Sequence, residues 1–134
     1  MQAMNHCRQR MLADKGIIAA RSWTRMRGLI GRSSLERGEG LLLLGTKGIH
    51  TIGMRFAIDV LFLDEDGRVV QLIHALKPYQ ISPLIGNSAM VLELPAGILR
   101  ETGTEVGDWI EVSLFKQGAL RKAMRQSKAP EQSS

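Results

Sequence analysis

Cysteine is nearly absent from this 134-residue chain, and its single thiol, Cys7, has no partner for an intrachain disulfide. Structural disulfides form in oxidising compartments of the cell. A single cysteine near the amino terminus therefore favours a reducing compartment. Polar side chains interrupt residues 1–15, which leaves no apolar run of the kind a secretory signal needs. The longest apolar runs, 41–44 and 60–63, are far shorter than the roughly 20 residues of a membrane helix. We therefore expect a cytoplasmic protein that is not an integral membrane protein.

Signature motifs of catalysis and of cofactor binding are also missing. The sequence has no Gly-x-Ser-x-Gly nucleophile elbow, no phosphate-cradling glycine motif and no dinucleotide fingerprint. His50 and His74 each lack a second metal ligand at short spacing. Asp64 and Asp66 precede Gly67, but the remaining ligands of a calcium loop are absent. We expect neither a metal nor a cofactor, and the sequence leaves open whether the protein is an enzyme.

Aromatic residues make up only 4% of the chain, too few for the stacking platforms of a single-strand nucleic-acid reader. Charge is distributed unevenly: residues 1–37 carry eight Lys and Arg against two acids, residues 38–115 five against ten, and residues 116–134 five against one. A solvated surface is the simpler interpretation, because nucleic-acid readers usually carry their basic stripe on the folded body. The alternative is weak contact with nucleic acid or an anionic membrane through Arg8, Arg10, Lys116, Arg121, Lys122 and Arg125.

Length and composition predict one domain with tails. An apolar content of 44% supports a single hydrophobic core. Residues 1–15 lack periodicity and are expected to be a flexible lead-in, residues 16–115 a single β domain, and residues 116–134 a basic tail. Both ends are expected to be dispensable for folding.

Short apolar runs between Gly and Pro turns predict a mainly β, α+β fold. A strand is expected from Gly16, and the four leucines at 41–44 predict a strand covered on both faces. Residues 56–63 and 68–76 are β-rich and joined by DEDG, the clearest hairpin signal in the chain. SAMVLEL and WIEVSLF predict further strands, and residues 23–30 a helix. We expect a compact sandwich or partly closed barrel of six or seven short strands with one short helix.

The DEDG turn allows two registers for the hairpin. In a type I turn with Gly67 in the left-handed position, a bulge follows and Asp59 lies diagonal to Gln71. In a two-residue loop the pairing shifts, and His74 becomes the diagonal neighbour of Asp59. The bulged register is favoured because glycine stands where that turn needs it.

Four motifs follow one another between Ile18 and Val112: GLIGRSSLERGEGLLL, HTIGMRFAIDVLFLDEDGRVV, LELPAG and GTEVGDWIEV. In this order they resemble the family known as domain of unknown function 192, and several spaced motifs are more specific than one. The resemblance implies a small, mainly β domain whose biochemical role is unassigned. It also marks the residues that match the family pattern: Arg25, Gly28, His50, Gly53, Met54, Arg55, Asp59, Glu93, Pro95, Gly97, Gly107 and Asp108.

Asp59 is the carboxylate of an otherwise apolar strand, so it must be paired or neutralised. The favoured interpretation is structural, with the carboxylate accepting backbone amides of the glycine-rich segment 45–54. A catalytic or ligand-binding role is the alternative. Loss of Asp59 is expected to destabilise the protein more than loss of Asp64 at the turn.

Glycines around His50 let the backbone approach a ligand closely, and Arg55 with backbone donors suits a small anion. The competing interpretation is structural: Met54 lies in the core, Thr51 and His50 satisfy the loop backbone, and Arg55 pairs with an acid such as Glu93.

The favoured function is a non-enzymatic binding or interaction module for an unknown small ligand or protein. Its candidate binding residues are His50, Thr51, Met54, Arg55, Asp59 and Glu93. The alternative is a small enzyme in which His50 or His74 forms an acid-base pair with Asp59 or Glu93.

Overall fold

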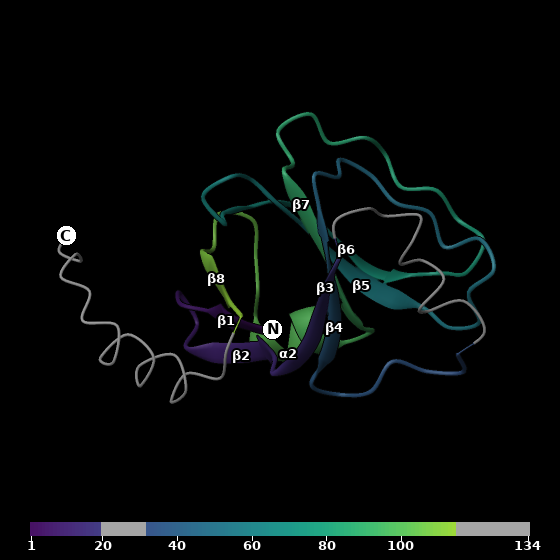
Figure 1. Ribbon diagram of the computed structural model, residues 1–134, viewed down its shortest axis with the longest axis horizontal. Coiled ribbons are helices and arrows are strands. Elements are labelled where there is room, and N and C mark those ends of the chain that lie inside the picture. The colour runs from purple at the N-terminus through teal and green to yellow at the C-terminus, as the bar shows by residue number, and fades with distance from the viewer. Residues whose placement is uncertain (20–31, 115–134) are drawn as a thin grey trace, which may run out of the picture.

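The computed structural model describes residues 1–19 and 32–114. The helix expected over 23–30 and the tail expected over 116–134 lie outside these ranges. The described residues form mostly strands, which pack as two sheets with one short helix, α2 (Ile98–Thr102) (Figure 1). The chain has the mainly β sandwich fold that its sequence predicts.

The smaller sheet brings together the two ends of the described chain. Its order is β2-β1-β8 with antiparallel pairing, and its strands are β1 (Gln2–Asn5), β2 (Arg10–Ala13) and β8 (Ile110–Ser113). The larger sheet has the order β3-β4-β7-β5-β6, and its strands are β3 (Lys15–Ala19), β4 (Glu39–Leu44), β5 (Ile58–Leu63), β6 (Val69–Leu76) and β7 (Met90–Pro95). In this sheet β3 and β4 run parallel, and the other pairs are antiparallel.

The sandwich core lies between the two sheets and beneath α2. It combines side chains of both sheets and the helix, among them Ala3, Leu12, Leu42, Leu61, Leu92, Leu94, Leu99 and Ile110. The leucine strand contributes to this core through Leu42, whereas its Leu41 and Leu43 face the other way. The expectation that this strand is covered on both faces is therefore confirmed.

A second apolar cluster covers the opposite face of the larger sheet. The strands contribute Leu41, Leu43, Ile58, Val60, Phe62 and Val91. Ile49 and Met54 of loop 45–57 pack onto them, and Ile85 of loop 77–89 packs at the margin. Among the described segments, irregular loops rather than a sheet therefore cover this face.

The predicted hairpin is formed by β5 and β6, and its turn has the bulged geometry. Gly67 has a φ of 87° and donates its amide to the Asp64 carbonyl at 3.0 Å, while the Asp64 amide donates to the Arg68 carbonyl at 2.9 Å. A Cβ atom on Gly67 would lie 2.5 Å from the Ile110 carbonyl oxygen, so only glycine fits here. The same close approach lets Gly67 accept the Ile110 amide at 2.9 Å, which joins the two sheets.

Residues 1–15 are not the flexible lead-in that the sequence predicts. β1 pairs with β8 along its whole length, and Leu12 of β2 is only 2% exposed. Two features explain why the sequence pattern did not predict these strands. The partner of β1 lies at the far end of the domain, and the buried residue at position 5 is an asparagine, which interrupts the alternation of apolar and polar residues. The folded domain thus begins before residue 16.

The segment after β7 contains α2. Gly97 and Gly103, with φ values of 99° and 72°, frame this five-residue helix, and its Ile98 and Leu99 are buried. Glycine in the left-handed conformation commonly ends a helix, as Gly103 does here. In the described part of the chain, no helix is long and apolar enough to cross a membrane.

Replacing Leu12 with alanine tests whether the amino-terminal strands belong to the fold. Because Leu12 fills the core between the sheets, Leu12→Ala should lower the free energy of unfolding by about 2 to 5 kcal/mol. Met11 precedes it on the same strand but is 40% exposed, so Met11→Ala should change this free energy by only about 0.5 kcal/mol. Denaturant unfolding measures both, and equal stabilities of the two variants would contradict the docking of β2.

Candidate functional site

The residues singled out from the sequence lie on both sides of the larger sheet. Asp59 of β5 pairs with Leu94 of β7, whose side chain belongs to the sandwich core. Glu93 pairs with Leu41 and Val60, which belong to the second cluster. Residues that pair across strands share a face. The two buried carboxyl groups, Asp59 and Glu93, therefore point in opposite directions and do not line one cavity.

Three backbone amides hold the Asp59 carboxylate. Its Oδ1 accepts a hydrogen bond from Ala75 at 2.8 Å, and its Oδ2 accepts from Gly97 at 3.0 Å and from Leu99 at 2.9 Å. These bonds satisfy a fully buried carboxylate. They also fasten β6 and the beginning of α2 to the central strand β5.

Two details of the expectation for Asp59 are wrong. Its donors come from β6, the LELPAG loop and α2, not from the glycine-rich segment 45–54. A register shift beyond the turn places Gln71 opposite Phe62 instead of diagonal to Asp59. A further irregularity in β6, where Ala75 has a φ of 50°, presents the Ala75 amide to Asp59. Such bulges leave no mark on the apolar pattern of a strand.

Thr51 and Met54 are buried, whereas Arg55 is exposed. The Thr51 hydroxyl donates to the Lys77 carbonyl at 2.7 Å and accepts from the Gln80 amide at 2.9 Å. Thr51 thus fastens loop 45–57 to loop 77–89, and Met54, at 1% exposure, packs in the second cluster.

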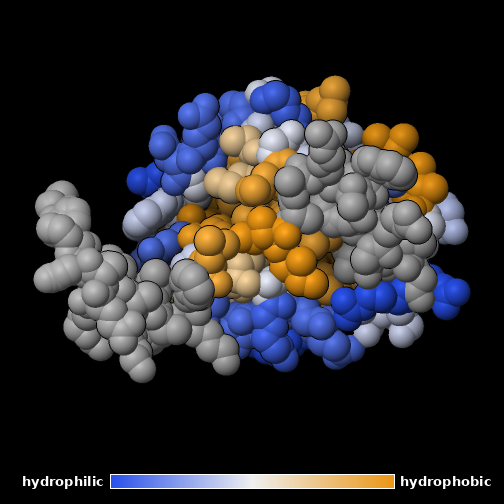
Figure 2. Space-filling view, in the orientation of Figure 1, coloured by the Kyte–Doolittle hydropathy of each residue, from blue (hydrophilic) through white to orange (hydrophobic). Residues whose placement is uncertain are grey.

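The two loops enclose an apolar groove of about 260 Å³. Three of its aliphatic side chains are open to solvent: Ile52 is 48% exposed, Ile81 75% and Leu84 81%. Figure 2 shows apolar surface at the upper right, where the loops lie in Figure 1. We call this feature the loop groove, and it is lined by Gly48, Ile49, His50, Ile52, Ile81, Ser82 and Leu84.

Hydrogen bonds between the loops fix the walls of the loop groove. Ile49 and Ser82 form two of them: the Ser82 amide donates to the Ile49 carbonyl at 2.9 Å, and the Ile49 amide donates to the Ser82 hydroxyl at 2.9 Å. The Thr51 amide donates to the Gln80 carbonyl at 2.8 Å. The groove is therefore held open by the fold and does not depend on a ligand for its shape.

His50 supplies a polar group to the loop groove. Its Nδ1 accepts the Ile52 amide at 3.3 Å, so the neutral imidazole carries its proton on Nε2. Among the described residues, Nε2 has no hydrogen-bond partner, and this N–H can donate to a bound molecule. Of the six candidates from the sequence, His50 alone lines the groove.

A hollow of about 510 Å³ lies beside the hairpin turn and is lined in part by Lys47, Glu65 and Asp66. Asp64, at its edge, accepts the amides of Asp66 and Arg68 at 2.9 Å each, as a turn-forming aspartate does. Within residues 1–19 and 32–114, no three His, Cys, Asp or Glu side chains are placed to hold a metal ion together. Turn formation accounts for these acids.

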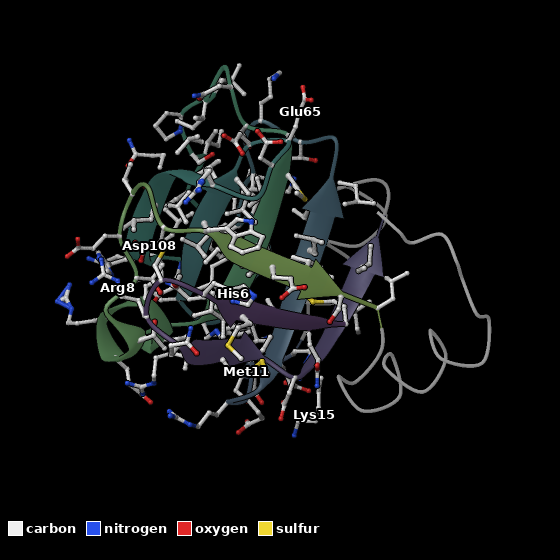
Figure 3. The ribbon with its side chains drawn as sticks, turned by 90° about the vertical axis from the view of Figure 1, so that its left-hand side faces the viewer. His6, Arg8, Met11, Lys15, Glu65 and Asp108 are labelled. Carbon is white, nitrogen blue, oxygen red and sulfur yellow. The ribbon has the colours of Figure 1, made fainter. Side chains whose placement is uncertain are left out.

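A buried polar cluster around Asp108 joins the loop after β1 to the loop before β8. Asp108 accepts a hydrogen bond from Asn5 at 3.0 Å. It accepts another from Arg8 at 2.9 Å, and Figure 3 shows these two side chains near each other. Asn5 also donates to Thr104 at 3.0 Å, and the Glu105 amide donates to Asp108 at 3.0 Å. In the sequence only Asp108 gave a signal, through its match to the family motif.

The Asp108 carboxyl has a pKa below its ordinary value. Burial by itself raises the pKa of this group, but the hydrogen bonds from Arg8, Asn5 and the Glu105 amide, with the charge of Arg8, lower it further than burial raises it. The ionised form of Asp108 is therefore part of the folded state.

Of the cationic residues that could contact nucleic acid or membranes, the structure describes Arg8 and Arg10. Both lie near carboxylates. Arg8 pairs with Asp108, and Arg10 lies 3.9 Å from Glu101. The others, Lys116, Arg121, Lys122 and Arg125, lie outside the described residues.

Removing the Asp59 carboxylate should destabilise the fold strongly. Asp59→Ala leaves three backbone amides without their acceptor. Each amide that stays buried should lower the free energy of unfolding by about 1 to 3 kcal/mol. Asp64→Ala also removes an acceptor of two amides, but Asp64 lies at a turn that water reaches, so the expected loss is about 1 kcal/mol or less. Urea unfolding compares the two variants with the wild type. Similar midpoints for Asp59→Ala and the wild type would show that the carboxylate does not support the fold.

Acidification should remove the contribution of Asp108 to stability. Its folded-state pKa is depressed, so the stabilisation is complete above the unfolded-state pKa, near 3.8, and is lost as the pH falls through the folded-state value. The wild type should therefore be more stable than Asp108→Asn at neutral pH, by about 1 to 3 kcal/mol, and this advantage should shrink below about pH 4. Unfolding curves of both proteins across this range measure it, and a difference that stays constant with pH would contradict the assignment.

Comparison with solved structures identifies the same fold elsewhere. A protein of unknown function from Novosphingobium aromaticivorans aligns with a TM-score of 0.70 and 22% identity over 83% of this chain and 82% of its own. A Sinorhizobium meliloti protein, provisionally described as a transcription regulator, aligns with a TM-score of 0.66 and 22% identity over 82% of this chain and 89% of its own. At this identity the likeness shows the fold alone.

Sequence relatives point to an uncharacterised family. The UPF0127 protein PF1050 of Pyrococcus furiosus is 38% identical over 63 residues, which span 47% of this chain and about half, 53%, of that protein. The model of the DUF192 family, described as uncharacterized ACR, matches residues 7–112. This match covers all strands of the larger sheet and α2 but begins after β1, and the chain belongs to the DUF192 family.

Proposed function

We propose that the protein is a non-enzymatic binding domain whose loop groove receives an aliphatic side chain of a partner protein. The observation that carries this proposal is the exposure of Ile52, Ile81 and Leu84 around one preformed groove. Single exposed apolar residues are ordinary, but several around a concave surface are typical of interaction sites. The single cysteine supports a cytoplasmic location for this binding.

The size of the loop groove favours a side chain over a whole small molecule. Pockets for small ligands usually enclose about 300 to 1,000 Å³, whereas this groove has about 260 Å³ and is open to solvent. One or two aliphatic side chains fill such a space. Burying each side chain fully stabilises the complex by about 1.5 to 3 kcal/mol, and the His50 Nε2–H adds a directional contact.

The acid-base alternative has less support. Asp59 is enclosed in the sandwich core, where three backbone amides occupy its oxygens. Glu93 is fully buried at the centre of the larger sheet, whereas His74 lies exposed on its edge strand β6. General acid-base catalysis needs its groups within hydrogen-bond reach of an accessible substrate.

A neutral side-chain mimic tests the loop groove directly. N-acetyl-leucinamide should shift the methyl NMR signals of Ile52, Ile81 and Leu84 with a dissociation constant of tens of millimolar or weaker, because a buried leucine supplies only about 1.5 to 3 kcal/mol. N-acetyl-glutaminamide is the control ligand and should leave these signals in place. Leu84→Ser should weaken the response to N-acetyl-leucinamide. Equal responses to both amides, or none, would refute the groove as an aliphatic site.

A further inference from the structure

We propose that the partner segment bound by the loop groove is acidic, with carboxylates beside the aliphatic side chain that enters the groove. This inference rests on the proposed function and adds the chemistry of the partner. It is carried by the charge of the two loop segments, 45–57 and 77–89, which contain Lys47, Arg55 and Lys77 but no Asp or Glu. Partners of interfaces carry complementary charge because it speeds encounter and rejects wrong partners.

The cationic loops contrast with the chain around them. Residues 38–115 hold five Lys and Arg and ten Asp and Glu. Three of the five cations lie in the two loop segments, which leaves two cations and all ten acids for the remainder. None of the ion pairs among the described residues uses Lys47, Arg55 or Lys77. The charges of Arg55 and Lys77 are therefore available to a partner.

Arg55 and Lys77 lie at one end of the loop groove. Thr51 connects them, since its hydroxyl donates to the Lys77 carbonyl and its own carbonyl accepts the amide of Met54, the residue before Arg55. Thr51 in turn stands between His50 and Ile52, which line the groove. The backbone of Lys77 and of the residue before Arg55 therefore contacts Thr51 beside the aliphatic wall, and we place the carboxylates of the partner at this end.

Lys47 marks the other end of the loop groove and is less suited to bind a partner. Its ammonium group donates to the carbonyls of Gly86 and Ser88, and it shares the second hollow with the acidic turn residues 64–66. The charge asymmetry along the groove predicts one orientation for the bound segment, with its acidic side toward Thr51.

Charge also argues against occupants from the same protein. A symmetric contact between two copies would place two cationic loop surfaces against each other, because each copy presents the same Lys47, Arg55 and Lys77. The chain segments outside the described residues are cationic as well: residues 20–31 have three Lys and Arg and no acid, and residues 115–134 have five and one acid. A different, acidic protein fits the groove better than a second copy or either segment.

Short synthetic peptides with one Ile-Leu core test this inference on the full chain. In the acidic peptide this core is flanked on one side by Glu and Asp, in the neutral peptide by Gln and Asn, and in the basic peptide by Lys and Arg. Fluorescence anisotropy gives the dissociation constant of each peptide. The acidic peptide should bind at least about tenfold more tightly than the basic one at low salt. This preference should fade at about 1 M salt, where the screening length is about 3 Å.

Matched variants assign the preference to the proposed end of the groove. Arg55→Glu and Lys77→Glu, each made as a single variant, should weaken binding of the acidic peptide and strengthen binding of the basic one. Arg100→Glu is the control, because Arg100 is an exposed cation on α2, outside the groove. An equal effect of Arg100→Glu would show that net charge alone acts, and would overturn the inference.

The remaining outcomes separate this inference from the proposed function. Equal affinities for the three peptides, all lost in Leu84→Ser, would leave the aliphatic groove standing and overturn the acidic partner. Acidic peptides that bind equally well with a Gly-Ser core would also overturn it.

Failure of every peptide and of N-acetyl-leucinamide would overturn the proposed function itself. Sedimentation with phosphatidylglycerol vesicles that depends on Arg55 and Lys77, without peptide binding, would replace the protein partner with a lipid surface.

Discussion

The larger sheet is apolar on both faces, and this constraint determines the rest of the molecule. The smaller sheet and α2 cover one face. On the other face Ile49, Met54 and Ile85 reach the sheet from loops, whose backbone cannot form a continuous ladder of hydrogen bonds. The same loops therefore bury some aliphatic side chains and leave Ile81 and Leu84 in solvent. The candidate binding surface follows from how this face is covered.

Polar groups buried at a few points keep this arrangement in one geometry. Asp59 ties β5 to β6 and α2, Thr51 ties the two loops together, and Asp108 ties Asn5 to the loop before β8. Each of these side chains accepts or donates bonds that apolar packing cannot supply, so each selects one arrangement among several that would bury similar area. Two of them, Asp59 and Asp108, are also among the residues that match the family pattern.

Local patterns predicted those parts of the fold whose partners are near in sequence. The leucine strand and the hairpin with Gly67 followed from apolar runs and one turn glycine. β1 could not be predicted in this way, because its partner β8 is distant and Asn5 hides its alternation. Of the residues that line the candidate site, the sequence predicted only His50. The segment that supplies Ile81 and Leu84 contains prolines and shows no periodicity, so it gave no signal. Its approach to His50 is a tertiary contact, which a local pattern cannot predict.

The central claim is that one groove, formed where loops replace a sheet, binds an aliphatic group. The most direct measurement is isotope-filtered NMR of the full chain with the acidic Ile-Leu peptide, which reports contacts between peptide and protein methyl groups. The account predicts contacts from the peptide to Ile52, Ile81 and Leu84. Contacts to another exposed apolar side chain instead, such as Ile17 of β3 at 61% exposure, would contradict it.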